Sequence, residues 1–151
     1  MREVRANILS PDVLAEADAV CVTTNGIIKA NGRAVMGAGV AKSFRDAYPG
    51  CDEMLAKHIR RNGHVVGAFM YFCEDSEGAV VSFPTKQHWK NPSDIRLIHA
   101  SAMWLEGLAD MLGWKNVWLP RPGCSNGGLD WADVKPVIEP FFDDRFTVCY
   151  L

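Results

Sequence analysis

The sequence predicts an α/β fold, in which helices cover a mostly parallel, buried sheet. Three observations support it: strand-like segments alternate with amphipathic segments, the strand-like segments are largely apolar, and two Gly-rich loops each lead into a helix. The 151 residues match the size of one domain, and no repeat or linker divides residues 1–151. In such folds ligands bind where loops leave the carboxyl ends of strands, so we expect the site there.

The chain begins with a predicted strand, a short helix and a second strand. We expect the first strand over residues 2–9. The helix should begin with Ser10 as N-cap and Pro11 at the first helical position, and should run through Ala17. Residues 19–24 begin with four apolar residues and end with two threonines, which predicts a buried strand.

A loop with two Asn-Gly turns, at 25–26 and 31–32, comes before two predicted helices. The first helix starts near the first Gly-rich loop and is stopped by Pro49-Gly50, and the second covers residues 51–61. The apolar positions of the first helix recur at helical spacing; they are Val40, Phe44 and Ala47.

The rest of the chain alternates in the same way. A hairpin is expected first, with strands at 64–73 and 79–83 around an acidic turn at 74–78. The longest amphipathic helix follows at 94–112, with Ile95, Ile98, Ala102, Leu105 and Leu108 on one face. The remaining elements are a strand at 116–119, a helix at 131–142 interrupted by Pro136 and Pro140, and a strand at 146–151.

Charge and cysteine content limit the function classes. Sixteen Lys and Arg against eighteen Asp and Glu give a net charge of −2, unlike a protein whose main function is to grip nucleic acid through its phosphates. The five cysteines form no CxxC pair, so we expect no metal site and no disulfide framework. Cys124 with His88 as nucleophile and base is an arrangement we set aside, because a Cys in such a loop is usually packed. With no signal-peptide pattern and no apolar run of membrane-spanning length, we expect a reducing, cytoplasmic setting and no membrane.

The Gly-rich loops are candidate phosphate sites. Residues 37–39, Gly-Ala-Gly, open a predicted helix, so N–H groups and the positive end of the helix dipole can approach a phosphate; a tight turn has the same pattern. This loop lacks the Lys of a Walker A loop and the third Gly of a dinucleotide-binding fingerprint. Loop 123–129 also lies between a strand and a helix. Together the loops predict a clamp for a diphosphate, with two ordinary turns as the alternative.

Four segments occur in the order and spacing of a known family: ADAVCVTTNG, NGRAVMGAGVAKSF, SFPTKQHW and LPRPGCSNGGLDW. In them the chain resembles the macrodomains, specifically the branch that contains the DarG antitoxin and the terminal ADP-ribose protein glycohydrolase. The resemblance covers nearly the whole chain. It implies a three-layer α/β/α sandwich with a mixed central sheet and ADP-ribose in a cleft across the strand ends.

The resemblance also implies ligand contacts. Asn7 and Ile8 fall where relatives hold adenine, with Asn7 in place of an acidic residue, so a neutral carbonyl would accept the amino group's hydrogen bond. Asn25 matches an asparagine that contacts the distal ribose; its alternative role is an Asn-Gly turn. The implied diphosphate contacts are Gly37, Ala38, Gly39, Val40, Gly123, Cys124, Ser125, Asn126, Gly127, Gly128 and Leu129.

Lys86 matches the lysine that hydrolytic members place beside the distal ribose, where it attacks the anomeric carbon. An amine attacks only when unprotonated, which burial or a neighbouring cation favours. The alternative is a cation that pairs with phosphates or with nothing. The terminal glycohydrolase carries an Asp where this chain has Gly127, and Asp130 suits the N-cap of the helix at Trp131. If that carboxylate is indispensable, the protein binds without cleaving.

Aromatic and basic residues near the predicted site indicate what kind of substrate it can bind. Trp89 lies in a polar loop, where its indole can stack on a base of the substrate. We expect the other tryptophans considered, Trp104, Trp114, Trp118 and Trp131, in the core or between layers. A cationic rim suited to a nucleotide or nucleic acid is expected from Lys86, His88, Lys90 and Arg121.

The resulting hypothesis is an ADP-ribosyl hydrolase that removes ADP-ribose from a macromolecule, with a modified DNA base favoured as substrate. Lys86 and Asn25 would be its catalytic residues, and neither a cofactor nor a metal is expected. The alternatives are a non-catalytic ADP-ribose reader and a phosphatase acting on ADP-ribose 1''-phosphate. Nothing in the sequence requires an assembly, so we expect a monomer.

Overall fold

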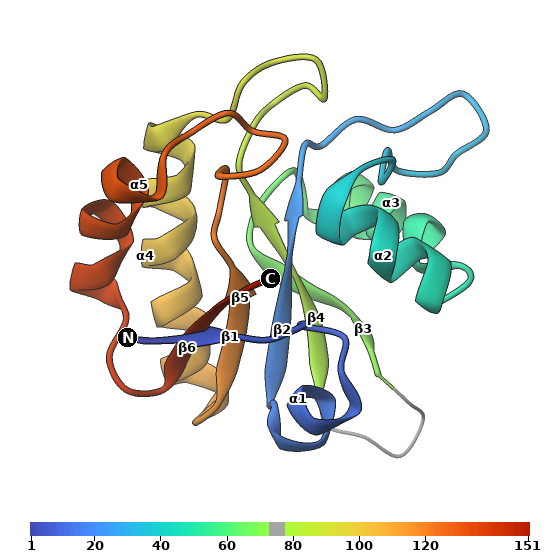
Figure 1. The fold of residues 1–151 in the computed structure, drawn as a ribbon. Helices are drawn as coiled ribbons and strands as arrows, with labels where there is room; N and C mark the ends of the chain where they lie inside the picture. Colours follow the sequence, from blue (N-terminus) through green and yellow to red (C-terminus); the bar gives the residue numbers. More distant parts are fainter. Residues whose placement is uncertain (73–77) are drawn as a thin grey trace.

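The computed structural model describes residues 1–72 and 78–151, and its centre is one six-stranded sheet. The strands are β1 (Arg2–Arg5), β2 (Ala19–Thr24), β3 (Gly67–Tyr71), β4 (Ala79–Pro84), β5 (Val117–Pro120) and β6 (Phe146–Tyr150). Their order across the sheet is β1-β6-β5-β2-β4-β3 (Figure 1). All neighbours are parallel except β3 and β4, which are antiparallel. The predicted mostly parallel, mixed sheet is therefore confirmed.

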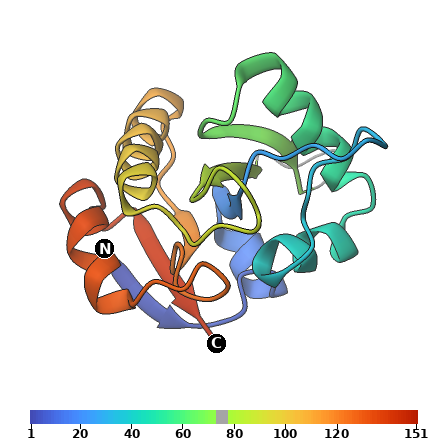
Figure 2. The ribbon, with the colours of Figure 1, turned by 90° about the horizontal axis from the view of Figure 1, so that it is seen from above.

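Helices cover both faces of the sheet and make three layers (Figure 2). They are α1 (Pro11–Glu16), α2 (Gly39–Ala47), α3 (Cys51–Asn62), α4 (Ile95–Leu112) and α5 (Trp131–Ile138), with a 3₁₀ turn at Glu139–Phe141. In β2, Ala19 and Cys21 pack toward α4 and α5, whereas Val20 and Val22 pack toward α1, α2 and α3. Because side chains alternate along a strand, an all-apolar strand needs a helix layer on each face.

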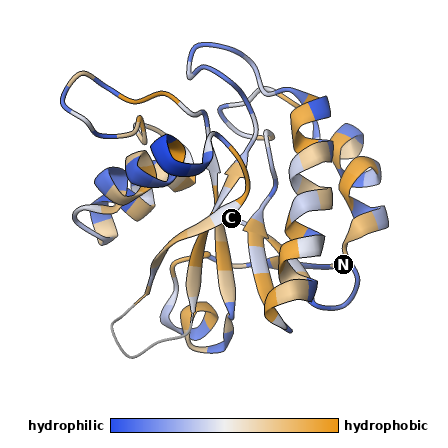
Figure 3. Cartoon of the chain, turned by 180° about the vertical axis from the view of Figure 1, so that it is seen from behind, coloured by the Kyte–Doolittle hydropathy of each residue, from blue (hydrophilic) through white to orange (hydrophobic). Residues whose placement is uncertain are grey.

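The two cores lie on either side of the sheet. Phe83 and Phe146 are fully buried in the core under α4 and α5, and Phe44 is fully buried in the core under α2 and α3. Figure 3 shows hydrophobic residues concentrated along the central strands, with hydrophilic residues on the outer surfaces of the helices. Burial of apolar side chains between the sheet and its helix layers therefore stabilises the fold.

Capping side chains mark the starts of two helices, of which the cap at Ser10 was predicted. Ser10 is the N-cap of α1, its hydroxyl accepts the N–H of Val13, and Pro11 occupies the first position. Asp94 is the N-cap of α4 and accepts the N–H of Arg96 at 2.9 Å. Both side chains satisfy amides that a helix start leaves without a partner.

Strand β1 is shorter than the predicted strand 2–9, because the chain turns at Asn7. The Asn7 side-chain carbonyl accepts the N–H of Leu9 at 2.9 Å, and its backbone carbonyl accepts the N–H of Ser10 at 2.9 Å. The hairpin prediction is confirmed in type, with β3 also shorter than expected. Of the predicted acidic turn 74–78, residues 74–77 lie outside the described residues.

The C-terminal helix differs from the prediction at its prolines. Pro136 lies inside α5 without interrupting it; the carbonyl it leaves without a donor is that of exposed Ala132. Pro140 falls in the 3₁₀ turn that ends the helix. The tryptophan prediction holds for Trp114 and Trp118, which are buried, and is wrong for Trp104, which is 62% exposed on α4. Trp131 is half-buried.

No helix in the described part of the chain combines the length and the apolar composition that crossing a bilayer requires. Within the same residues the cysteines Cys21, Cys51, Cys124 and Cys149 are free thiols, and no cluster of His, Cys, Asp and Glu is arranged to hold a metal ion.

Candidate functional site

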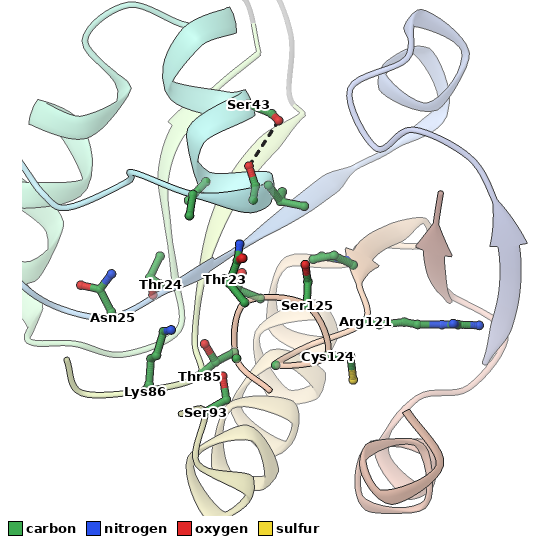
Figure 4. A pocket seen from close by; sticks show the side chains of 18 of the residues that line it. Thr23, Thr24, Asn25, Ser43, Thr85, Lys86, Ser93, Arg121, Cys124 and Ser125 are labelled. Carbon is green, nitrogen blue, oxygen red and sulfur yellow. Dashed lines mark hydrogen bonds between the residues drawn. The ribbon is translucent and has the colours of Figure 1, made fainter. Parts of the chain in front are cut away.

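A cleft of about 1210 Å³ lies at one edge of the sheet (Figure 4). Strands β1, β6, β5, β2 and β4 are parallel, so their carboxyl ends share that edge, and residues directly after them line the cleft. Gly128 was predicted as a contact but does not line it; its φ of +76° serves a turn. The predicted residues that do line it are Asn7, Ile8, Asn25, Gly37, Ala38, Gly39, Val40, Lys86, Gly123, Cys124, Ser125, Asn126, Gly127 and Leu129.

The first Gly-rich loop presents unpaired amides to the cleft. Helix α2 begins at Gly39, and its N-cap, Ala38, has no side chain that accepts a hydrogen bond. Among the hydrogen bonds of residues 1–72 and 78–151, none uses the N–H groups of residues 37–41. Open amides at the positive end of a helix dipole favour an anion.

The second Gly-rich loop presents another row of amides. It is held by the N–H of Leu129 donating to the Gly123 carbonyl at 2.9 Å and that of Gly128 donating to Ser125 at 3.2 Å. The N–H groups of residues 125–127 are used by none of the hydrogen bonds in the described ranges. A Cβ built on Gly39 would lie 3.0 Å from the side-chain nitrogen Nδ2 of Asn126, so this side chain brings the second loop close to the first. This is the geometry expected of a diphosphate clamp.

Gly127 is required by close packing. A Cβ built on it would collide with the Ser93 hydroxyl and would lie 2.6 Å from the Gly123 carbonyl oxygen. The Gly127 carbonyl also accepts the N–H of Ser93 at 2.9 Å, which ties this loop to the segment before α4. The loop therefore excludes, in this conformation, the aspartate that one branch of the resembled family carries here.

Lys86 and Asn25 come together because β4 and β2 are neighbours. Thr24 pairs with Pro84 in the ladder, and the N–H of Thr85 donates to the Thr24 carbonyl at 3.1 Å. Figure 4 shows Asn25 and Lys86 beside each other where these strands end. The parallel register thus places an amine and an amide at the same end of the cleft.

Both side chains already have partners. The Asn25 carbonyl accepts the N–H of Ile27 at 3.0 Å, and its amide donates to the Val35 carbonyl at 3.4 Å. The predicted turn role of Asn25 is therefore present, and each end of its amide keeps one further bonding position. The Lys86 ammonium donates to the Trp89 carbonyl at 3.4 Å, which orients it along its own loop.

A buried polar network supports this end of the cleft from below. The hydroxyl of Thr24 shares hydrogen bonds of 2.8 Å with His64 Nε2 and 2.9 Å with the Ser82 hydroxyl. Burial lowers the pKa of His64, the neighbouring His58 adds to this effect, and contacts with Gln87 and Thr24 oppose it. Burial therefore favours the neutral form of the His64 imidazole in the folded state.

The other end of the cleft holds a stacked cation. The Arg121 guanidinium lies 4.0 Å from the ring centroid of Tyr150 and 5.1 Å from that of Trp131. Glu3 accepts hydrogen bonds from Trp131 and Lys135, and the Lys135 bond lowers the pKa of the Glu3 carboxyl. Arg121 follows β5, with β2 between it and the strand of Lys86, so the predicted rim is not one cluster.

Cys124 and His88 do not form a nucleophile and base. The Cys124 thiol donates to the Pro122 carbonyl at 3.3 Å, and burial raises the pKa of this thiol, which disfavours the reactive thiolate. His88 is not among the residues that line the cleft and stacks on Trp89 instead. Asp130 stands at the N-cap position of α5 as predicted, but its side chain makes no capping hydrogen bond there.

The charge of the cleft suits an anion. In the part of the chain that the structure describes, its basic lining residues are Lys29, Lys86 and Arg121, and its acidic lining residue is Asp130. The family model of the Macro domain matches residues 29–138, which include both Gly-rich loops and Lys86. The chain belongs to the macrodomain family.

Relatives of this macrodomain agree in sequence and in structure. It is 33% identical to the DNA ADP-ribosyl glycohydrolase of Mycobacterium tuberculosis over 131 residues, 83% of this chain and 35% of that protein. It is 30% identical to the same-named protein of Thermus aquaticus over 148 residues, 92% of this chain and 37% of that protein. The solved macrodomain of Thermus aquaticus DarG matches with a TM-score of 0.80 and 28% identity, covering 99% of this chain and 97% of that one. The chain spans about a third of the length of these curated relatives.

Sequence reasoning missed part of this macrodomain's cleft. Thr24 is the last residue of β2, Thr85 directly follows β4, and Tyr150 and Leu151 are the last residue of β6 and the residue after it. Applying the carboxyl-end rule to every strand would have found them. Ser93 had no such signal, because its place in the cleft depends on packing and a backbone bond against the second Gly-rich loop, which lies far along the chain.

Proposed function

We propose that this macrodomain is an ADP-ribosyl glycohydrolase that binds ADP-ribose in the cleft and releases it from a modified DNA base. The observation that carries the proposal is a pair of segments with unpaired amides, residues 37–41 and 125–127, that line the same cleft, with Lys86 at one end of it. The names of the relatives from Mycobacterium tuberculosis and Thermus aquaticus support the substrate.

The proposed pose follows from the two ends of the cleft. The diphosphate lies between the loops, where main-chain amides neutralise it. The adenosine lies toward Asn7 and Tyr150, because aromatic and amide groups suit a base. The distal ribose then lies toward Asn25 and Lys86, with its anomeric carbon facing the amine.

Lys86 acts on the anomeric carbon in the proposed mechanism. As a nucleophile, its neutral amine forms a bond to that carbon while the bond to the DNA base breaks, and the base leaves with the electron pair and takes up a proton. Water then hydrolyses the adduct and returns the amine. As a cation, it would instead stabilise charge near the reacting sugar.

The test uses a single-stranded oligonucleotide that carries ADP-ribose on one base, with release of ADP-ribose followed by chromatography. We expect turnover by the wild type and a loss on the order of a hundredfold or more in kcat for Lys86→Ala. Lys86→Arg, which keeps the charge, separates the two roles, since retained activity indicates a cation and lost activity a nucleophile. Full turnover by Lys86→Ala would refute the assignment.

A non-catalytic ADP-ribose reader is the second candidate, and one observation favours it. In residues 1–72 and 78–151, the carboxylate that lines the cleft is Asp130, which follows the second loop, whereas Gly127 inside the loop has no room for a side chain. Tight binding of free ADP-ribose in calorimetry, without turnover of ADP-ribosylated DNA, ADP-ribosylated protein or ADP-ribose 1''-phosphate, would establish the reader. Turnover of the phosphate alone would establish the phosphatase.

The setting is part of the same proposal. We infer a monomeric protein in a reducing, cytoplasmic environment, and the buried free thiols of Cys21, Cys51 and Cys149 support the reducing setting. Size-exclusion chromatography with light scattering at micromolar concentration tests the monomer.

A further inference from the structure

The loop between β4 and α4 carries an exposed aromatic at the edge of the cleft. We call residues 86–93 the mouth loop. Within it Trp89 is 49% exposed and also lines the cleft. Single exposed aromatic rings occur on many protein surfaces, but this one borders the cleft, so its ring is accessible to a ligand that extends out of the cleft.

The mouth loop holds the Trp89 ring in place. The His88 ring stacks on it at 5.4 Å between centroids with an interplanar angle of 28°, and the Lys90 ammonium lies 5.2 Å from its centroid. The N–H of Lys90 donates to His88 Nδ1 at 3.1 Å, and the N–H of Asn91 donates to the His88 carbonyl at 3.1 Å. The ring is therefore a preorganised surface rather than a free side chain.

Trp89 is adjacent to the proposed reacting centre. The Lys86 ammonium donates to the Trp89 carbonyl, so the two residues belong to one hydrogen-bonded turn. Lys29 lines the cleft from the loop that precedes α2, which stands beside the mouth loop above the sheet (Figure 1). In the described residues Lys29 and Lys90 form no ion pair with a carboxylate, so their charges are available to an anion.

We propose that Trp89 stacks on the nucleobase next to the modified base of single-stranded DNA, while Lys90 and Lys29 pair with the flanking phosphates. The inference rests on the proposed function and deepens it. Stacking of a base on an aromatic ring is stronger than an exposed cation–π contact, so the base displaces the Lys90 ammonium toward a phosphate. A duplex keeps its base faces stacked inside the helix, whereas an unpaired strand presents them.

The test compares two ADP-ribosylated substrates, a single-stranded oligonucleotide and the corresponding mononucleotide. We expect the wild type to prefer the oligonucleotide in kcat/KM. Trp89→Ala should reduce the ratio of the two kcat/KM values about tenfold, the effect of one stacking contact. Trp89→Phe should keep most of the preference, and Trp104→Ala, which removes an exposed indole on α4, should keep all of it.

Salt dependence tests the phosphate contacts. Lys90→Ala should lower the slope of log Kd against log salt for the oligonucleotide by about 0.7. An unchanged ratio in Trp89→Ala would overturn the inference. Equal affinity for duplex and single-stranded substrate, or a preference for ADP-ribosylated protein, would overturn it as well.

The proposed function and the inference fail in different ways. Absence of turnover on both substrates contradicts the glycohydrolase. The Kd values of the same oligonucleotide and mononucleotide, measured in wild type and Trp89→Ala, then decide the inference without any chemistry.

Discussion

Gly127 is the residue whose replacement has the most direct structural consequence. Gly127→Ala would force its Cβ against the Ser93 hydroxyl and the Gly123 backbone. Overpacking of this kind costs about 2 kcal/mol. For a chain of this size we expect a fall in Tm of about 5 °C, measured by differential scanning calorimetry.

Gly37→Ala is the matched control for Gly127→Ala. A Cβ at Gly37 meets no protein atom within 4 Å, so the Tm should stay within about 1 °C of the wild type. Its added methyl group instead points into space that we assign to the diphosphate. Equal Tm losses in both variants would contradict the packing argument at Gly127.

The sequence was enough to predict many of the loop residues that line the cleft, but not how these residues pack against the rest of the chain. The glycines of both loops and Lys86 are visible as local patterns, and all but Gly128 line the cleft. The exclusion of a side chain at Gly127 depends on how the loop folds back on the Gly123 backbone and on Ser93, which lies far along the chain, and the residue types alone show neither contact. The exposure of Trp104 was not predictable either, because the apolar character of a residue does not by itself determine whether it is buried.

At the scale of elements, the turn between α3 and β3 links stability to pH. The folded state lowers the pKa of His64 below its usual 6.5, so the unfolded chain binds a proton more readily in this range. The contribution of His64 to the free energy of unfolding should therefore be fully present above about pH 6.5. The free energy of unfolding should fall as the pH drops below that value.

His64→Gln should remove the part of this pH dependence that His64 contributes. Urea denaturation at pH 7.5 and pH 5.5 measures the change in unfolding free energy between the two conditions. That change should be smaller in His64→Gln than in the wild type. An identical change in the wild type and His64→Gln would show that the buried network with Thr24 is not the cause.

Element types were predictable where side chain and backbone agree locally. Ser10 with Pro11 and Asp94 mark helix starts by their own hydrogen bonds, and β2 falls on its predicted residues 19–24. The predicted ends of elements were wrong where an interaction outside the local pattern sets the end of the strand or helix. Asn7 turns the chain and shortens β1, and Pro136 is tolerated because its missing hydrogen bond falls on an exposed carbonyl near the helix start.

At the scale of the whole molecule, the cleft gathers carboxyl ends from most of the sheet, so a ligand that spans it should stabilise the entire domain. At free ADP-ribose one hundred times its Kd, the gain is about 2.7 kcal/mol, which corresponds to a rise in Tm of about 8 °C. AMP, which lacks the diphosphate bridge, should give a much smaller rise at the same concentration. Equal rises with AMP and ADP-ribose would contradict the diphosphate clamp.

The layered architecture was predictable because its cause is periodic along the sequence, namely apolar strands between amphipathic helices. The order of the strands was not, because register and neighbours depend on contacts such as β2 with β4 and β5, between segments up to about a hundred residues apart. The position of Asn25 and Lys86 at the same end of the cleft depends on that order.

The N–H groups that line both Gly-rich loops belong to the polypeptide backbone, which every amino acid except proline shares. Alanine scanning of residues 37–41 and 125–127 would therefore leave the anion-binding groups in place wherever the substitution fits, and would understate the importance of these segments. Proline, a one-residue insertion or an ester linkage in place of a peptide bond reaches them, because each removes or displaces the donor itself.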